Sequence, residues 1–280
     1  MNRILLNRIL LALLLFVTCL ITAFAQSYGE LPATVEELLP LAEAGDSDAQ
    51  FQLAETYYYD VVPPDYEAAA KWHAACAKKG DSRSQVALGI AYYLGQGVPE
   101  DIDESVRLIK MAADQNNETA QYLLGYFYYQ GVGVEEDYDK AFLWMSKAAK
   151  AGDSDAERQF GSFYYLGIGT ECDFETAHRW YRKAADHGNE EAQYNVANDY
   201  YFGLGVEQDW GEALRWYRIS AENGYAEAQY RLACMLDKGI VIQQDSQKAL
   251  EWARRAADQD FYPANLLIDE IMERQQSQRP

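Results

Sequence analysis

Few residues of this 280-residue chain have the types and spacing that metal binding or catalysis needs. The histidines are His73, His178 and His187, and none has a second ligand four residues away or in a Cys/His cluster. His178 falls in a helical pattern, where a solvated ring is expected. No arrangement of Ser, His and Asp stands out, although the members of a catalytic triad can be far apart in sequence. We therefore predict no catalytic residue, no metal site and no cofactor.

The cysteines do not predict a disulfide framework. Beyond the first 25 residues they are Cys76, Cys172 and Cys234, an odd number at irregular spacing. Cys76 and Cys234 fall in helical patterns and are expected to be small buried apolar side chains. Cys172 falls in a predicted loop, where we expect a free thiol.

A recurring aspartate is a candidate for calcium binding, at Asp65, Asp101, Asp137, Asp173, Asp209 and Asp245. Each of these residues stands just before a helical pattern. Aspartate is a favoured N-cap, because its side chain accepts a hydrogen bond from a backbone N–H of the first turn. We therefore interpret the row as helix caps rather than as a calcium site.

A phrase rich in tyrosine and glycine occurs four times at intervals of 36 residues, as in YYQGVGV from Tyr128 and YYLGIGT from Tyr164. A glycine-rich loop can bind phosphate when it follows a strand and opens a helix. Here the preceding pattern is helical, and glycine after a helix commonly takes the left-handed conformation that ends it. The phrase therefore predicts a helix end and a turn.

The same period organises most of the chain. Each unit ends at a marker, and the markers are Gly45, Gly80, Asn116, Gly152, Gly188, Gly224 and Asp260. Small residues at positions 4 and 9 after a marker and large ones at positions 8 and 12 share one helical face. A second pattern in each unit places a large side chain, usually Trp, between two small ones. Because two helices cannot bury their apolar faces alone, neighbouring units must stack into an all-α solenoid.

The unit from Ala120 to Ala149 reads A-x-x-x-L-G-x-x-Y-x-x-G-x-G-V, then D, then A-x-x-W-x-x-K-A-A. It is similar to the Sel1-like repeat, a relative of the tetratricopeptide repeat, and the likeness covers roughly Gly45 to Asp260. The resemblance implies a right-handed α-solenoid of about six helix-turn-helix repeats with capping helices. It also implies an adaptor or scaffold role, as in exported bacterial proteins of this type.

Two other functions stay open. A cysteine-rich branch of the family is linked to penicillin binding and β-lactam hydrolysis, but it has a cysteine pair in each unit that this chain lacks. A hydrolase is therefore the second hypothesis and a purely structural spacer the third.

In tetratricopeptide-like solenoids the first helix of each pair lines the concave surface. By that analogy, positions 6, 10 and 13 after each marker face inward, and tyrosine is common at recognition surfaces. We predict an aromatic floor for a protein or peptide partner, formed by Tyr93, Tyr122, Tyr126, Tyr129, Tyr165, Tyr194 and Tyr201. The alternative is that several of these rings only pack. Acids at the helix starts would surround the floor and favour a basic partner segment: Asp153, Asp155, Glu190, Glu191 and Glu227.

The start of the chain predicts export. Arg3 and Arg8 precede an apolar run and Ala23-Phe24-Ala25, which is the pattern of a secretory signal peptide cleaved after Ala25. A membrane anchor needs ~20 apolar residues, and the run is shorter. The formal net charge of −20 would become −22 after cleavage. Such acidity disfavours nucleic acid and anionic membranes as partners. We expect the protein in the periplasm or outside the cell.

The predicted organisation has four parts. Residues 1–25 are the signal peptide, and 26–44 are a linker with a capping helix. Six repeats span 45–79, 80–115, 116–151, 152–187, 188–223 and 224–259. Residues 261–280 are a closing helix, expected from Tyr262 to about Met272, and a loose polar tail from Gln275.

Overall fold

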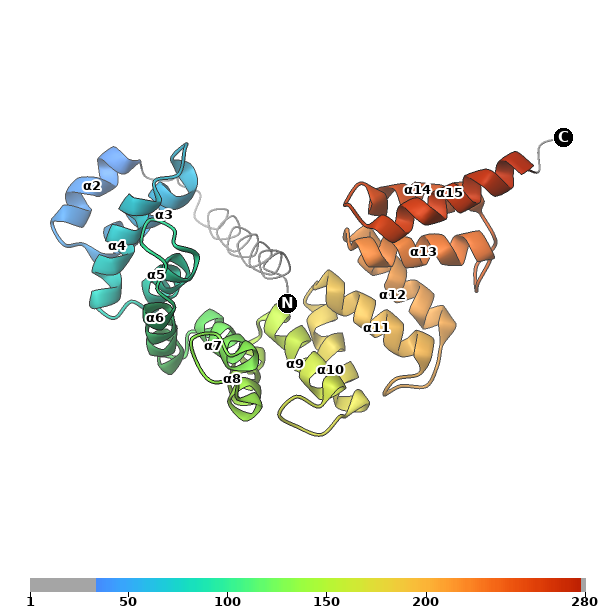
Figure 1. Ribbon diagram of the computed structural model, residues 1–280, viewed down its shortest axis with the longest axis horizontal. Coiled ribbons are helices and arrows are strands. Elements are labelled where there is room, and N and C mark those ends of the chain that lie inside the picture. The colour runs from blue at the N-terminus through green and yellow to red at the C-terminus, as the bar shows by residue number, and fades with distance from the viewer. Residues whose placement is uncertain (1–33, 278–280) are drawn as a thin grey trace. The chain divides into compact units, whose positions relative to one another are not determined.

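The computed structural model describes residues 34–277, where every regular element is a helix (Figure 1). The predicted signal peptide lies outside this range. The described residues form two compact units. The first contains Gln96–Pro99 and the helices α2 (Val35–Glu43), α3 (Ser47–Glu55), η1 (Thr56–Asp60) and α4 (Tyr66–Lys78). The second contains α5 (Ser82–Leu94), α6 (Ile102–Asp114), α7 (Glu118–Gln130), α8 (Tyr138–Ala151), α9 (Ser154–Leu166), α10 (Phe174–Asp186), α11 (Glu190–Phe202), α12 (Trp210–Glu222), α13 (Ala226–Lys238), α14 (Ser246–Ala257) and α15 (Tyr262–Ser277).

The second unit is a chain of stacked helix pairs. Each odd-numbered helix from α5 to α13 packs on the helix that follows it, and that second helix packs on the first helix of the next pair. Figure 1 shows this succession from the green helices to the red ones. The prediction of an all-helical repeat solenoid is confirmed.

Aspartate and glycine set the limits of the helices as predicted. The recurring aspartate is the N-cap of every second helix, and its carboxylate accepts a bond from a first-turn backbone N–H, as Asp137 does from Lys140 at 2.9 Å. Glycine caps the C-termini of the first helices in the left-handed conformation from α5 to α13. The turn markers also have positive φ, including Asn116 at 64° and Asp260 at 61°.

Small residues allow the two helices of a pair to approach closely. A Cβ added to Gly125 of α7 would lie 3.0 Å from the backbone nitrogen of Met145 in α8. A Cβ on Gly161 of α9 would lie 2.8 Å from the ring of Tyr181 in α10. Glycine therefore occurs in these pairs because the facing side chain or backbone leaves no room for a methyl group.

The second glycine of each turn serves the contact between repeats. A Cβ on Gly169 would collide with the carbonyl oxygen of Tyr138, and one on Gly205 with that of Phe174. Both carbonyls belong to the first residue of the second helix in the preceding repeat. The glycine turn of one repeat thus packs directly on the backbone of its neighbour.

The two ends of the array depart from the pattern. In the first repeat, which lacks both glycines, α3 continues into the π-helix Thr56–Asp60. In the sixth repeat Val241 replaces the second glycine and still takes a positive φ of 62°. We predicted a loose tail from Gln275. For residues 275–277 that prediction is wrong, because α15 continues to Ser277. Arg274 in its last turn pairs with Asp237 of α13, which explains the extra length.

Gly169→Ala tests the contact between repeats. We expect a loss of at least about 2 kcal/mol in unfolding free energy, because the methyl group meets backbone that cannot move aside and alanine disfavours positive φ. The control is Gly188→Asn, a marker with open space around it where another repeat already has Asn116. This control should change stability by less than about 1 kcal/mol in urea unfolding. Equal losses of unfolding free energy in the two variants would contradict the close packing of Gly169 on the preceding repeat.

Candidate functional site

The predicted tyrosines lie on the first helices of four successive repeats, α5, α7, α9 and α11. Tyr122 is buried at 9% exposure, and the other members are partly buried. Tyr93, Tyr129 and Tyr194 contact rings of the next repeat. Tyr165 and Tyr201 contact rings of their own repeat. The structure therefore gives several of them a packing role without removing them from the surface.

Two groups of rings can be distinguished. Tyr93 stacks on Phe127 at 5.8 Å between ring centroids, and Tyr129 lies 5.4 Å from Phe163 in the next repeat. Burial raises the pKa of Tyr126, and the nearby Tyr93 and Tyr129 raise it further.

The second group surrounds Tyr217 of α12. The centroid of the Tyr217 ring lies 5.7 Å from that of the Tyr194 ring and 6.4 Å from that of the Tyr201 ring. The Tyr217 hydroxyl donates to Asn198 Oδ1 at 2.7 Å. Tyr165 belongs to neither group by ring contact, and it packs edge-on against Phe174 at 5.1 Å.

An ion pair lies between α9 and α11 in the same stretch. Arg158 Nη1 is 3.1 Å from Glu191 Oε1, and the Arg158 side chain is only 15% exposed. Tyr122 is close enough to Arg158 for the guanidinium to lower the pKa of its phenol, although burial raises that pKa more. Arg158 is therefore a largely buried cation that pairs with Glu191.

Two carboxylates at this location, those of Asp153 and Glu191, have a raised pKa. Burial raises the pKa of Asp153 to about 6, even though its side chain accepts a bond from the Ala156 backbone, and nearby acids add to the shift. Burial also raises the pKa of Glu191, where Arg158 opposes the effect and Asp155 adds to it. A further cation nearby would therefore favour the charged form of both acids.

Tyr225 is a residue that the sequence analysis did not select. It occupies the N-cap of α13, where the other first helices have a capping side chain: Asp46, Asp81, Asn117, Asp153 and Asn189. Tyr225 makes no side-chain cap bond, and its ring instead packs 5.3 Å from Tyr194. The signal in the sequence was a tyrosine at a position that needs a hydrogen-bond acceptor.

With this geometry established, we compared the chain with known proteins. A family model described as "Sel1 repeat" matches residues 47–81, 82–117, 119–153, 154–189, 190–225 and 226–261. The chain belongs to the Sel1 repeat family. No curated protein matches it significantly.

Two solved structures support the Sel1 assignment. A Sel1 repeat protein from Oxalobacter formigenes aligns with a TM-score of 0.70 and 28% identity, over 79% of this chain and 96% of that one. The protective antigen c5321 of uropathogenic Escherichia coli, which displays an SLR fold, aligns with a TM-score of 0.68 and 32% identity. That alignment covers 85% of this chain, which spans 59% of the antigen's length.

A buried polar side chain recurs in the first helix of every Sel1 repeat, at Gln50, Gln85, Gln121, Glu157, Gln193 and Gln229. Gln193 is typical: its amide donates to Ala185 O at 3.3 Å, and its carbonyl accepts from Asn223 at 2.8 Å. Glu157 is the exception, and its fully buried carboxylate lies 2.8 Å from Lys183 Nζ and 2.9 Å from His187 Nδ1. These side chains tie helix ends together, so we assign them to the fold.

The expected solvated ring of His178 is wrong. His178 is 8% exposed, and its Nδ1 lies 2.9 Å from Asp199 Oδ2 of the next repeat, which is also buried. Burial raises the pKa of Asp199 more than the hydrogen bond with His178 lowers it. The ring is covered because the next repeat supplies both this acid and the edge-on ring of Tyr200.

The remaining candidate groups lie apart from one another. Cys76 is buried, Cys234 is partly buried and Cys172 is exposed, and none of the three forms a disulfide within the described residues. Within residues 34–277 no three His, Cys, Asp or Glu side chains are grouped so that they could hold a metal ion. No helix in that range has the length and apolar character to cross a membrane.

Asp153→Asn tests the uncompensated charge. Asparagine retains the capping oxygen, as Asn117 and Asn189 show in other repeats. Because the folded pKa of Asp153 is about 6 against an ordinary 3.8, its charge costs stability above pH 6, and this cost fades as the pH falls toward 3.8. We expect the variant to be more stable by ~1–2 kcal/mol at pH 7.5, with most of the gain lost at pH 4. A gain that does not depend on pH would refute the proposed cause.

The His178–Asp199 pair yields a double-mutant test. Other repeats have Leu214 and Met235 at the equivalent positions. His178→Leu should cost about 3 kcal/mol in chemical unfolding, because it leaves a buried carboxyl without its partner. Adding Asp199→Met should recover most of that loss. Additive losses in the double variant would show that the two side chains do not act as a pair.

Proposed function

We propose that this Sel1 repeat solenoid is an exported adaptor that binds a basic segment of another protein through the first helices of its second unit. The observation that carries the proposal is the combination of partly exposed tyrosines with the carboxylates of Asp153 and Glu191. Burial raises the pKa of both acids, so a cation from a partner would lower their free energy in the charged state.

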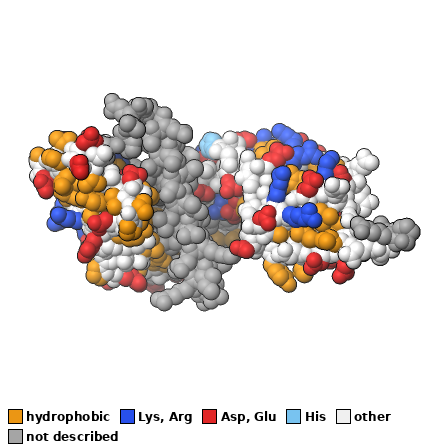
Figure 2. Space-filling model, turned by 90° about the horizontal axis from the view of Figure 1, so that it is seen from above, with side chains coloured by type: hydrophobic (Ala, Val, Ile, Leu, Met, Phe, Trp, Pro, Cys, Tyr) orange, Lys and Arg blue, Asp and Glu red, His pale blue; other side chains and the backbone are white. Residues whose placement is uncertain are grey.

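The surrounding side chains fit the same partner. Tyrosine rings can pack on aliphatic stems and bind Lys or Arg through their faces. Asp155, Glu190 and Glu227 are close enough to raise the pKa of Glu191, so several carboxylates converge at the starts of α9, α11 and α13. Toward the C-terminal end, Figure 2 shows basic side chains interspersed with acidic and hydrophobic ones. The converging carboxylates therefore suit a basic segment better than that mixed surface does.

Export is proposed from the sequence alone. The signal-peptide pattern ending at Ala25 predicts release into the periplasm or beyond the cell. One of the similar structures is a protein described as a protective antigen, a description that fits an exported protein. Fractionation of the native host should find a chain that begins at Gln26 outside the cytoplasm.

We propose a role without catalysis, in keeping with the scaffold function common among helical-repeat proteins. Hydrolysis of a chromogenic β-lactam by the mature chain should not exceed the buffer rate. A rate well above that background, lost on heating, would support the hydrolase instead.

The binding surface is tested by affinity capture from an envelope extract, with the mature chain as bait. A specific partner should be lost with Tyr225→Asn, a change that supplies the missing cap of α13 and is expected to stabilise the fold by ~1 kcal/mol. Leu143→Ala is the control, since Leu143 is an exposed apolar residue on the second helix α8.

The same capture should weaken at high salt and below about pH 6, where Asp153 becomes protonated. A partner retained equally by Tyr225→Asn and by wild type, with no dependence on salt or pH, would contradict this surface. Loss of the partner in Leu143→Ala as well would move the interface to the second helices.

A further inference from the structure

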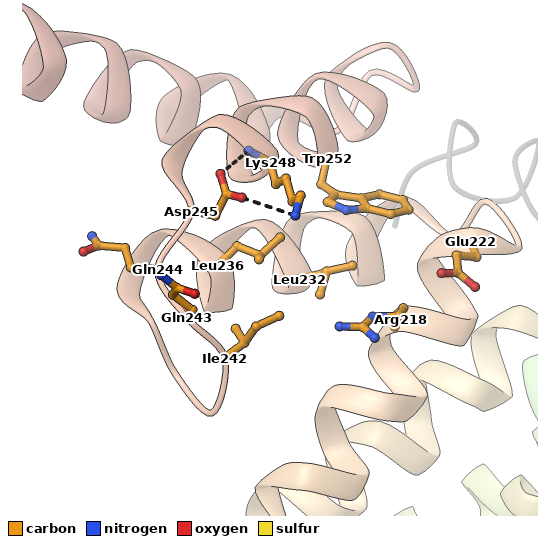
Figure 3. Close-up of a pocket in the computed structure, with 10 residues that line it drawn as sticks. All are labelled: Arg218, Glu222, Leu232, Leu236, Ile242, Gln243, Gln244, Asp245, Lys248 and Trp252. Carbon is orange, nitrogen blue, oxygen red and sulfur yellow. Dashed lines mark hydrogen bonds and ion pairs between the residues drawn. The ribbon is translucent and has the colours of Figure 1, made fainter.

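A cavity of about 600 Å³ lies in the sixth repeat, away from the tyrosines described above. It is bounded by α12, α13, α14 and the turn between α13 and α14 (Figure 3). Leu232 and Leu236 of α13 and Ile242 of the turn form its apolar wall, and Trp252 of α14 stands at one side. The charged residues that line it are Lys248 and Arg218 together with the carboxylates of Asp245 and Glu222.

The repeat pattern explains why this space exists. The twelfth position after each marker holds tyrosine in the first five repeats: Tyr57, Tyr92, Tyr128, Tyr164 and Tyr200. In the sixth repeat the same position holds Leu236. The Tyr164 ring packs 5.4 Å from Phe142 and 5.1 Å from Phe160, so the phenol occupies the space between adjacent repeats. Leucine lacks the ring, and the cavity lies beside it.

One group that contacts the ring in the third repeat recurs in the sixth. Lys140 pairs with Asp137 and holds its ammonium 5.2 Å from the centroid of the Tyr128 ring. Lys248 is the equivalent lysine, and it pairs with Asp245 at 3.4 Å on the cavity wall (Figure 3). A ring inserted beside Leu236 would therefore meet a lysine positioned for a cation–π contact.

Arg218 differs from Arg182, the equivalent residue one repeat earlier. Arg182 lies 4.7 Å over the Trp216 ring and pairs with Asp186 at 3.1 Å. Arg218 makes no ion pair within the described residues, and Trp252 remains partly exposed rather than buried like Trp216. Glu222, the equivalent of Asp186, also lines the cavity but forms no ion pair with Arg218, so the guanidinium can meet a carboxylate that comes with the ring.

We propose that this cavity, the ring slot, binds an aromatic side chain of a protein partner that carries a carboxylate nearby. The chain's own tyrosines show that a phenol fits the equivalent space, and Arg218 supplies the charge complement for the acid. The ring slot is lined by α12, α13 and α14 and the turn before α14, and none of the tyrosines of the proposed binding surface lines it. An acidic aromatic segment at the slot and a basic segment at the tyrosines are separate contacts.

The test uses Leu236→Tyr in the mature chain, which restores the residue of the other repeats and fills the slot from within. We expect a rise in Tm, because the ring enters a space already shaped for it. The probes are p-cresol, which is the tyrosine side chain, and N-acetyl-tyrosine, which adds the carboxylate. Binding is followed by the indole N–H signal of Trp252, assigned through its loss in Trp252→Phe.

Wild type should bind p-cresol saturably with a Kd in the ~millimolar range, as a fragment of this size allows. Leu236→Tyr should weaken this binding at least tenfold. Arg218→Ala should weaken N-acetyl-tyrosine several-fold while leaving p-cresol unchanged, which separates the role of the carboxylate from that of the ring.

Several results would overturn the proposal. One is a wild-type signal that does not saturate up to the solubility limit of p-cresol, and another is equal binding by Leu236→Tyr. A fall in Tm for Leu236→Tyr would show that the cavity is not shaped for a ring. Self-association of wild type that Leu236→Tyr abolishes would identify a second copy of the chain as the occupant instead.

Discussion

The close approach of two helices at an alanine or glycine is the constraint on which the rest of this structure depends. Gly125 faces the backbone of Met145 and Gly161 faces the ring of Tyr181, so neither position has room for a larger residue. Large rings pack both within a pair, as Tyr201 does on Tyr217, and at the joints between pairs, where Tyr129 reaches Phe163 of the next repeat. The joints bury apolar surface that a single pair leaves exposed, which is the physical reason that a single pair is insufficient.

This arrangement also indicates where function is to be sought. Positions that build the joint recur with the same residue type, so a departure needs its own explanation. Tyr225 gives up a helix cap, and Leu236 gives up a ring. Asp153 keeps its cap but carries a charge that asparagine avoids in two other repeats. Tyr225 and Asp153 are N-caps of first helices at the tyrosine surface. Leu236 lines a separate cavity.

The fold was predictable because its determinants are local. Asp137 caps its own helix and Gly131 ends the helix before it, so a short stretch of sequence contains both signals. The site was less predictable because its properties arise between repeats. His178 looked solvated on its own helix, and only the next repeat supplies Asp199 to cover it. The seven tyrosines were found by position, but the burial of Tyr122 beside Arg158 depends on a neighbouring helix.

The most direct test of the account is the dependence of stability on the number of repeats. Chains containing one, three or five consecutive repeats from residues 82–261 would be unfolded in urea and followed by far-ultraviolet circular dichroism. The account predicts that one repeat is unfolded in buffer, and that the free energy of unfolding rises with each joint added. A single repeat with the helix content and urea midpoint of the five-repeat chain would contradict it.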